Sequence, residues 1–175
     1  MTDFRRPEPL RAEHDTTEFD CGSEAQTGWL REYALQAHRA GSSRVFVSCL
    51  SGSNRVAGYY ALAAGGVERE VAPARISQGL GRYPIPVVIL TRLGVDIRNQ
   101  GEGLGQNLVR DALLQTAATA DHVGVRALLI HAETPEAAAF YRRISTSFME
   151  SPSDPLHLLL LIKDLRAAIR EAPSL

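Results

Sequence analysis

The feature that most constrains the fold of this chain is a glycine-rich run, QGEGLG, at residues 100–105. It follows a β-branched, apolar stretch from Val87 to Val95 and opens a helical pattern from Leu104 to Ala120. Backbone N–H groups at a helix N-terminus lack intrahelical partners, and the helix dipole favours an anion there. Glycines let the backbone approach such an anion closely. The order of strand, glycine turn and helix therefore predicts a cradle for a pyrophosphate group.

The spacing of these glycines excludes two common phosphate-binding motifs. No Gly-Lys-Ser/Thr follows, as a P-loop requires, and Gln106 stands where the dinucleotide fingerprint Gly-x-Gly-x-x-Gly needs its third glycine. What remains is Gln-x-x-Gly-x-Gly, with Gln100, Gly103 and Gly105 in register. For so short a pattern, a plain glycine turn before an ordinary helix is the alternative interpretation.

Composition limits the remaining classes of protein. The chain has 175 residues, of which 45% are hydrophobic, which is enough for one domain with a substantial core. Its formal net charge of −1 argues against indiscriminate coating of nucleic acid but permits a local basic patch, built from arginine because Lys163 is the only lysine. Cys21 and Cys49 indicate reduced structural thiols. With no apolar signal core and no stretch long enough to cross a membrane, we expect a cytoplasmic protein.

The pattern along the chain predicts one domain with a mixed α/β sheet. Helical spacing follows residue 23, where Trp29, Leu30, Tyr33, Ala34 and Ala37 form a stripe expected to pack in the core. We expect strands at 44–50, 56–62, 127–132 and 156–162, a loop at 68–86, and a helix at 135–143. Residues 1–15 are expected to be a mobile segment and 163–175 a helical tail. Antiparallel strands followed by two strand–helix units indicate helices on both faces of the sheet.

This order of elements resembles the GNAT acyltransferases, and the glycine run resembles their acetyl-CoA pyrophosphate loop. Across nearly the whole chain the sequence is similar to the GNAT toxins of type II toxin–antitoxin pairs, the TacT type that acetylates aminoacyl-tRNA. Besides the cradle, the matching pieces are 19–22 (FDCG), 56–62 (VAGYYAL), 84–87 (PIPV), 90–96 (LTRLGVD), 139–141 (AFY) and 153–156 (SDPL). One departure is the segment Ile144–Phe148, where the family has a compact Phe-Gly-Phe turn, so we expect a differently shaped or mobile loop there.

The resemblance implies a GNAT fold, in which a mixed, mostly antiparallel sheet has splayed central strands that hold the pantetheine arm of acetyl-CoA. It implies charged tRNA as the substrate, a ribbon-helix-helix antitoxin as the partner, and a homodimer. In this sequence the cofactor-binding positions would be Leu93, Val95, Gln100, Gly101, Gly103, Leu104, Gly105, His131, Ala132 and Phe140.

Tyr141 is the candidate general acid. A phenol, with a pKa of about 10, keeps its proton at pH 7 and can pass it to a departing thiolate, whose thiol has a pKa of about 8.5. Without the resemblance, Phe140 and Tyr141 would be interpreted as an aromatic pair that packs a helix onto the sheet. His131 lies on an apolar strand and is expected to be a core histidine, and we predict no metal.

The acceptor is less well specified than the donor. No carboxylate marks a dedicated base, which favours an α-amino group, with a pKa near 7.7–8.0, over a lysine side chain near 10.4. The candidates for contacts with tRNA phosphates are Arg75, Arg82, Arg92, Arg142 and Arg143. Two alternatives stay open: a GNAT enzyme that acetylates a small amine or a protein N-terminus, and a non-catalytic module that binds CoA or a partner.

Overall fold

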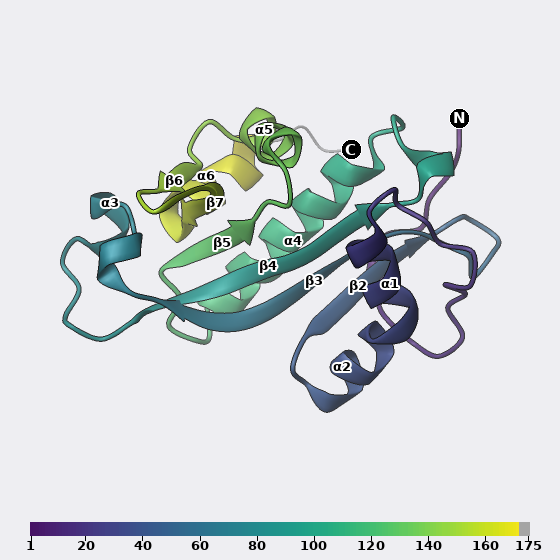
Figure 1. Cartoon of the computed structure of the whole chain (residues 1–175), viewed down its shortest axis with the longest axis horizontal. Coiled ribbons are helices and arrows are strands. Elements are labelled where there is room, and N and C mark those ends of the chain that lie inside the picture. The colour runs from purple at the N-terminus through teal and green to yellow at the C-terminus, as the bar shows by residue number, and fades with distance from the viewer. Residues whose placement is uncertain (172–175) are drawn as a thin grey trace. The chain divides into compact units, whose positions relative to one another are not determined.

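The computed structural model describes residues 1–171 and contains a mixed sheet of seven strands (Figure 1). Their order in the sheet is β1-β2-β3-β4-β5-β7-β6. Pairing is antiparallel for β1–β2, β2–β3, β5–β7 and β6–β7 and parallel for β4–β5, which confirms the predicted mixed, mostly antiparallel sheet. The strands are β1 (Glu8–Pro9), β2 (Arg44–Cys49), β3 (Val56–Val67), β4 (Ile85–Val95), β5 (Ala127–His131), β6 (Met149–Ser151) and β7 (Asp154–Leu161).

The helices follow the sequence pattern closely at the cradle and near the C-terminus. They are α1 (Glu24–Glu32), α2 (Ala34–Ala40), α3 (Ala74–Ser77), α4 (Leu104–Ala120), α5 (Pro135–Ile144) and α6 (Ile162–Glu171), with short 3-10 turns η1 (Arg69–Val71) and η2 (Ile97–Asn99). The helix α4 has the predicted bounds. Of the predicted helical tail, residues 162–171 form α6, and 172–175 lie outside the described residues. No helix in the described part of the chain is both long and apolar enough to cross a membrane.

The chain folds into two compact units. Unit 1 comprises residues 1–63 and 91–112, and unit 2 comprises residues 64–90 together with the described residues from 113 onwards. The strands β3 and β4 contribute residues to both units.

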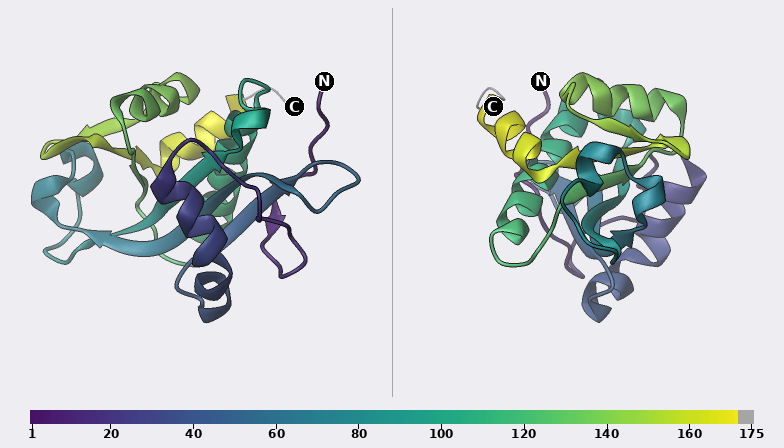
Figure 2. Two further views of the ribbon diagram at one scale, coloured as in Figure 1. Left: turned by 45° about the vertical axis from the view of Figure 1, so that its right-hand side comes forward. Right: turned by 90° about the vertical axis from the view of Figure 1, so that its left-hand side faces the viewer.

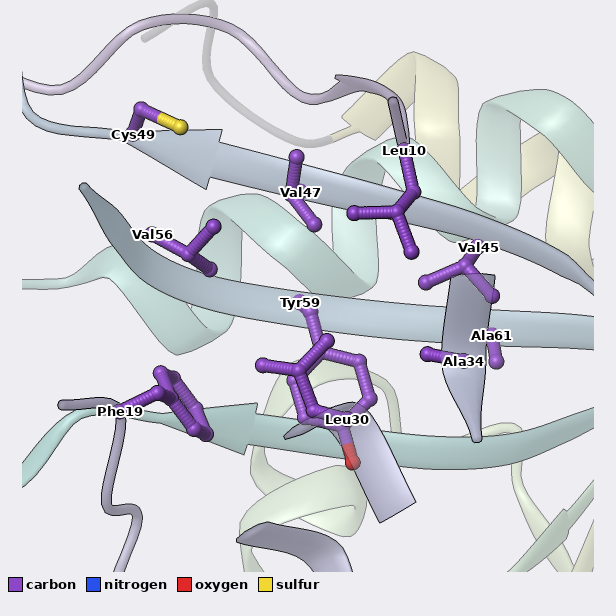
Figure 3. Close-up of a cluster of buried hydrophobic side chains, with 10 residues drawn as sticks. All are labelled: Leu10, Phe19, Leu30, Ala34, Val45, Val47, Cys49, Val56, Tyr59 and Ala61. Atoms are coloured by element: carbon purple, nitrogen blue, oxygen red, sulfur yellow. The ribbon is translucent and has the colours of Figure 1, made fainter. Parts of the chain in front are cut away.

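The core of unit 1 lies between β1–β3 and the helices α1 and α2 (Figure 3). At its centre the Tyr59 ring meets Phe19 edge to face at 5.6 Å, and its hydroxyl donates to the Gln26 carbonyl over 2.7 Å. Gly58 allows close packing, because a Cβ there would lie 2.8 Å from a terminal methyl group of Leu108 in α4, which would have to move. The cluster consists of Leu10, Phe19, Leu30, Ala34, Val45, Val47, Cys49, Val56, Tyr59 and Ala61.

The predicted helical stripe is correct for Leu30 and Ala34, which are buried, but wrong for Tyr33, whose side chain is 58% exposed. The chain leaves helical geometry at Tyr33 (φ −120°, ψ −24°), where α1 ends and α2 begins. Because the helical spacing does not continue through this break, Tyr33 does not face the core with its neighbours.

The N-terminal segment is paired rather than mobile, which corrects the expectation for residues 1–15. Phe4 forms a β-bridge with Leu50, and the Arg5 N–H donates to the Cys49 carbonyl over 2.8 Å. The strand β1 then pairs with β2, and the Leu10 side chain is buried. Backbone pairing and one apolar anchor therefore fix this segment on the edge of the sheet in unit 1.

Unit 2 is built around β5 and β7. Thr134 caps α5 by accepting the Ala137 N–H, and Pro135 occupies the first turn, where its missing N–H has no effect on helical bonding. The helix α6 follows β7 directly (Figure 2).

The predicted loop at 68–86 contains η1 and α3. A hydrogen bond stabilises it, in which the Arg69 guanidinium donates to the carbonyl of Gly81 over 2.9 Å. The core consists of Val67, Ala72, Ile76, Ile85, Val87, Ala127, Leu129, Leu159 and Leu161.

Candidate active site

The cradle in unit 1 is a turn whose backbone conformation demands glycine. Gly101 and Gly103 have φ of +81° and +83°, a region that other residues rarely adopt. A Cβ at either position would meet no heavy atom within 4 Å, so conformation rather than crowding requires glycine. Leu104 begins α4 immediately afterwards, and Gly105 lies in its first turn. The space that a side chain would fill at these two glycines, just before a helix N-terminus, is therefore open, which is compatible with anion binding there.

Two side chains hold this turn in place. The Gln100 amide donates to the carbonyls of Val95, over 2.9 Å, and Cys21, over 3.2 Å. Asp96 caps η2 by accepting the Arg98 N–H over 2.9 Å, and it also accepts the Arg98 guanidinium at two positions, each at 2.8 Å. The Gln100 side chain is thus engaged with the protein itself, which leaves its backbone as the group that can face a pyrophosphate.

Asp96 and Arg98 were not singled out from the sequence. The Asp96 side chain is fully buried, which by itself would raise its pKa. Hydrogen bonds from the Arg98 side chain and backbone, and from the Asp20 N–H, outweigh that effect and hold the pKa of Asp96 below its usual value. The available signal was an Asp placed just before a helical turn at the end of a strand, which is a typical N-cap.

The strand positions expected to hold pantetheine are divided between the two units. Leu93 and Val95 lie half-buried on β4 in unit 1, and the Val95 carbonyl accepts Gln100. His131 ends β5 in unit 2, and the next residue, Ala132, donates its N–H to the Leu156 carbonyl over 2.8 Å. The N–H of Ala132 is therefore already bonded to β7.

The prediction that His131 is a core histidine is wrong. Its side chain is exposed and stacks on His157 at 4.1 Å between ring centroids, as a directly opposed pair of β5 and β7. The register between β4 and β5 ends at Ile130, so His131 is paired with β7 but lies beyond the pairing with β4. Although the residue as a whole is exposed, partial desolvation of its ring and the neighbouring His157 lower the pKa of His131.

Tyr141 lies on α5 in unit 2 and is 7% exposed. Its ring meets Phe140 edge to face at 5.3 Å and lies 6.5 Å from Phe148. Burial raises the pKa of Tyr141 above its usual value, so the phenol stays protonated throughout the neutral range. Burial also disfavours a thiolate. The raised pKa is therefore compatible with proton transfer from Tyr141 to a thiolate that shares its desolvated surroundings.

The segment after Tyr141 lacks the family's glycine but is held by local hydrogen bonds. The Ser145 N–H donates to the Tyr141 carbonyl over 3.3 Å, and the Ser147 N–H donates to the Ser145 hydroxyl over 3.2 Å. Phe148 is buried behind this turn. The turn at Ser145 and Ser147 therefore places the Phe148 ring near Tyr141.

Three of the five candidate arginines have partners within the protein. Arg75 forms a bidentate ion pair with Asp164, in which the distance from Nη2 to Oδ1 is 3.2 Å. Arg142 pairs with Glu150. Arg92 lies over the Trp29 ring, 5.3 Å from its centroid.

Arg82 and Arg143 differ from those three arginines. Their side chains are exposed, and neither forms an ion pair with any residue in 1–171. Their charges are therefore available to a ligand without first breaking a contact in the protein.

One cluster in unit 1 has the composition of a metal site. Ligand atoms of Glu8, His14 and Cys49 lie within 4.8 Å of one another. However, His14 Nδ1 accepts the Arg11 N–H over 2.9 Å, so the ring proton sits on Nε2, which lies 2.7 Å from a Glu8 oxygen. A metal needs a ring nitrogen with a free lone pair, and both nitrogens are engaged. The cluster is a hydrogen-bonded anchor between the N-terminal segment and β2.

Comparisons with known proteins find similar chains that cover almost the whole length of this one. No family model matches the sequence. A tRNA-acetylating toxin of Mycobacterium tuberculosis is 44% identical over 169 residues, which are 97% of this chain and 99% of the relative.

Two solved structures cover almost the whole fold. AtaT complexed with acetyl-methionyl-tRNAfMet matches with a TM-score of 0.84 at 28% identity, covering 94% of this chain and 98% of the other. A Tyr→Phe variant of AtaT, bound to acetyl-CoA and the C-terminus of the antitoxin AtaR, matches with a TM-score of 0.80 at 27% identity, covering 97% and 99%.

Proposed function

Because the chain belongs to the GNAT family of tRNA-acetylating toxins, we propose that it transfers the acetyl group of acetyl-CoA to the α-amino group of an aminoacyl-tRNA. The observation that carries this proposal is the 44% identity, which extends over 97% of the chain. The cradle supports it independently, since two glycines with positive φ precede a helix N-terminus with open space above them.

The chemistry is divided among a few groups. The backbone of residues 100–105 holds the pyrophosphate of acetyl-CoA. The Asp96 N–H is bonded to the Ala57 carbonyl over 2.8 Å, so the neighbouring Val95 N–H is the candidate donor to the oxyanion that forms at the acetyl carbonyl. As the amine displaces CoA, Tyr141 protonates the departing thiolate. The substrate's α-amino group attacks in its neutral form and needs no strong base, because its pKa is already near neutrality. The proton that its nitrogen loses on forming the amide passes to solvent, from which Tyr141 regains the proton that it gave to the thiolate.

Acetylation turns the α-amino group into an amide, which is not nucleophilic and cannot attack the growing peptide. We therefore infer that the enzyme inhibits translation and acts in the cytoplasm as the toxin of a toxin–antitoxin pair. The AtaT–AtaR complex supports an antitoxin as the partner. A homodimer and a ribbon-helix-helix antitoxin are further parts of the proposal.

The test is transfer of label from acetyl-CoA to total charged tRNA by the purified protein, with deacylated tRNA and free amino acids as controls. We expect label only on charged tRNA, released with the amino acid when the ester bond is hydrolysed. Labelling of free amino acids or small amines at comparable efficiency would instead identify a small-amine acetyltransferase. No labelling of any acceptor, with acetyl-CoA bound, would indicate a non-catalytic module.

A further inference from the structure

Unit 2 contains a pocket of about 340 Å³ that no part of the proposed chemistry uses. Its walls come from the α3 segment, from the residues just before β5, and from the junction of β7 and α6. This volume lies within the range of pockets that hold small ligands or groups of that size. The lining residues are Arg75, Gln78, Val125, Arg126, Leu161, Ile162 and Lys163.

The walls of this pocket are tied together by backbone and guanidinium contacts. The Arg126 guanidinium donates to the Ile76 carbonyl over 2.9 Å and to the Gln78 carbonyl over 3.3 Å. The Arg126 carbonyl in turn accepts the Ile162 N–H over 3.1 Å. Arg126 therefore joins the α3 segment to the start of α6, so the pocket is part of the packed structure of unit 2.

The pocket has an excess of positive charge. Three of its lining residues are cationic: Arg75, Arg126 and Lys163. Only Arg75 is neutralised, by its ion pair with Asp164, while Lys163 is exposed and forms no ion pair with any other described residue. Lys163 is also the only lysine of the chain, and its flexible ammonium group stands at a pocket lined by the guanidinium groups of Arg75 and Arg126.

We propose that this pocket binds a backbone phosphate of the tRNA substrate, with Lys163 as its principal contact and Arg126 as the rigid cation behind it. The proposal rests on the proposed function, because a polyanionic acceptor needs cations outside the site that binds acetyl-CoA. The overall charge of −1 means that general attraction cannot hold RNA, so binding depends on localised cations such as these. A phosphate contact of this kind positions the tRNA and is indifferent to its sequence.

The test compares Lys163 variants with a matched control on the same helix. Lys163→Gln removes the charge, Lys163→Arg keeps it, and Arg170→Gln removes an exposed charge of α6 that does not line the pocket. For Lys163→Gln we expect the KM for charged tRNA to rise about five- to tenfold at low salt and the slope of its logarithm against log salt to fall by about one. The kcat and the Kd for acetyl-CoA should be unchanged. Lys163→Arg and Arg170→Gln should behave like the parent protein.

Direct binding of deacylated tRNA separates failure of this inference from failure of the proposed function. If the parent protein acetylates no tRNA, the proposed function fails, yet a weaker Kd for deacylated tRNA in Lys163→Gln alone would still support the pocket. If acetylation proceeds and Lys163→Gln matches Arg170→Gln in KM, Kd and salt slope, the inference is overturned. It is equally overturned if Lys163→Gln leaves tRNA binding intact but weakens the complex with the antitoxin, because the pocket would then hold an acidic protein segment.

Discussion

The cradle of unit 1 and the functional groups of unit 2 are built in opposite ways. The cradle consists of consecutive residues, and the groups that we propose to hold the pyrophosphate are its backbone N–H groups, oriented by the positive φ of Gly101 and Gly103. In unit 2 the groups that we propose to act are side chains: Tyr141, whose ring lies near Phe148, and Lys163, whose pocket is lined by residues from separate segments of the sequence. A backbone site is lost when its conformation or the space over it changes. A side-chain site is lost when one chemical group is removed.

The largest expected effect tests the backbone half of this contrast. Gly103→Asp adds a side chain and a negative charge where the pyrophosphate should lie, at a positive φ that non-glycine residues rarely adopt. We expect the affinity for acetyl-CoA, measured by calorimetry, to fall by about 10³-fold, with the circular dichroism spectrum retained. Gly52→Asp is the matched control, because Gly52 has a φ of +75° and equally open surroundings but lies in the turn between β2 and β3. Equal affinities in the two variants would show that the glycine run is only a turn.

The same contrast explains what the sequence revealed. The cradle and α4 were predictable because strand, glycines and helix are contiguous, and each part has its own periodic or conformational signal. The basic pocket was not predictable, because Arg75, Arg126 and Lys163 meet only after three separate segments have packed. The exposure of Tyr33 and His131 was missed for a related reason. Local spacing indicates which residues lie on the same face of a helix or strand, but it does not show where a helix breaks or where the pairing of a strand ends.

The second-largest expected effect tests the side-chain site of unit 2. Tyr141→Phe removes only the hydroxyl from a buried ring, so packing against Phe140 and Phe148 persists. We expect kcat for charged tRNA to fall by about 10²-fold while the Kd for acetyl-CoA stays within a factor of about two. Tyr83→Phe, at a side chain that is 86% exposed, provides the control and should match the parent. Full activity of Tyr141→Phe would make Tyr141 a packing residue and assign protonation of the thiolate to another group.

A smaller effect concerns the support beneath the cradle. Asp96→Asn removes the charge from a buried carboxylate that accepts several hydrogen bonds, and we expect a loss of about 2 kcal/mol in the free energy of unfolding at pH 7. The pKa of Asp96 is lower in the folded protein than in the unfolded chain, where it is about 3.9. Its stabilisation is therefore complete above that value and disappears as the pH falls through the folded-state pKa. Urea titrations should show the parent and Asp96→Asn converging below about pH 4.

The control for this experiment is Asp121→Asn, which alters an exposed ion pair with Arg166 and should leave the unfolding free energy nearly unchanged. If Asp96→Asn were as stable as the parent at pH 7, the cradle would be held by Gln100 and its glycines without help from the buried carboxylate.

The smallest effect distinguishes two neighbouring arginines of α5. Arg143 is exposed and forms no ion pair with any residue in 1–171, whereas Arg142 pairs with Glu150 and also donates to the Pro155 carbonyl over 3.3 Å. If the free side chains of unit 2 serve tRNA, Arg143→Ala should reduce the salt slope of the KM for charged tRNA by up to about one, and Arg82→Ala should do the same. Arg142→Ala should change that slope much less, because the charge of Arg142 is already compensated by Glu150.

Equal effects of Arg142→Ala and Arg143→Ala would show that the ion pair between Arg142 and Glu150 opens to admit tRNA. A KM independent of salt in the parent protein would contradict phosphate contacts altogether and favour a small amine as the acceptor.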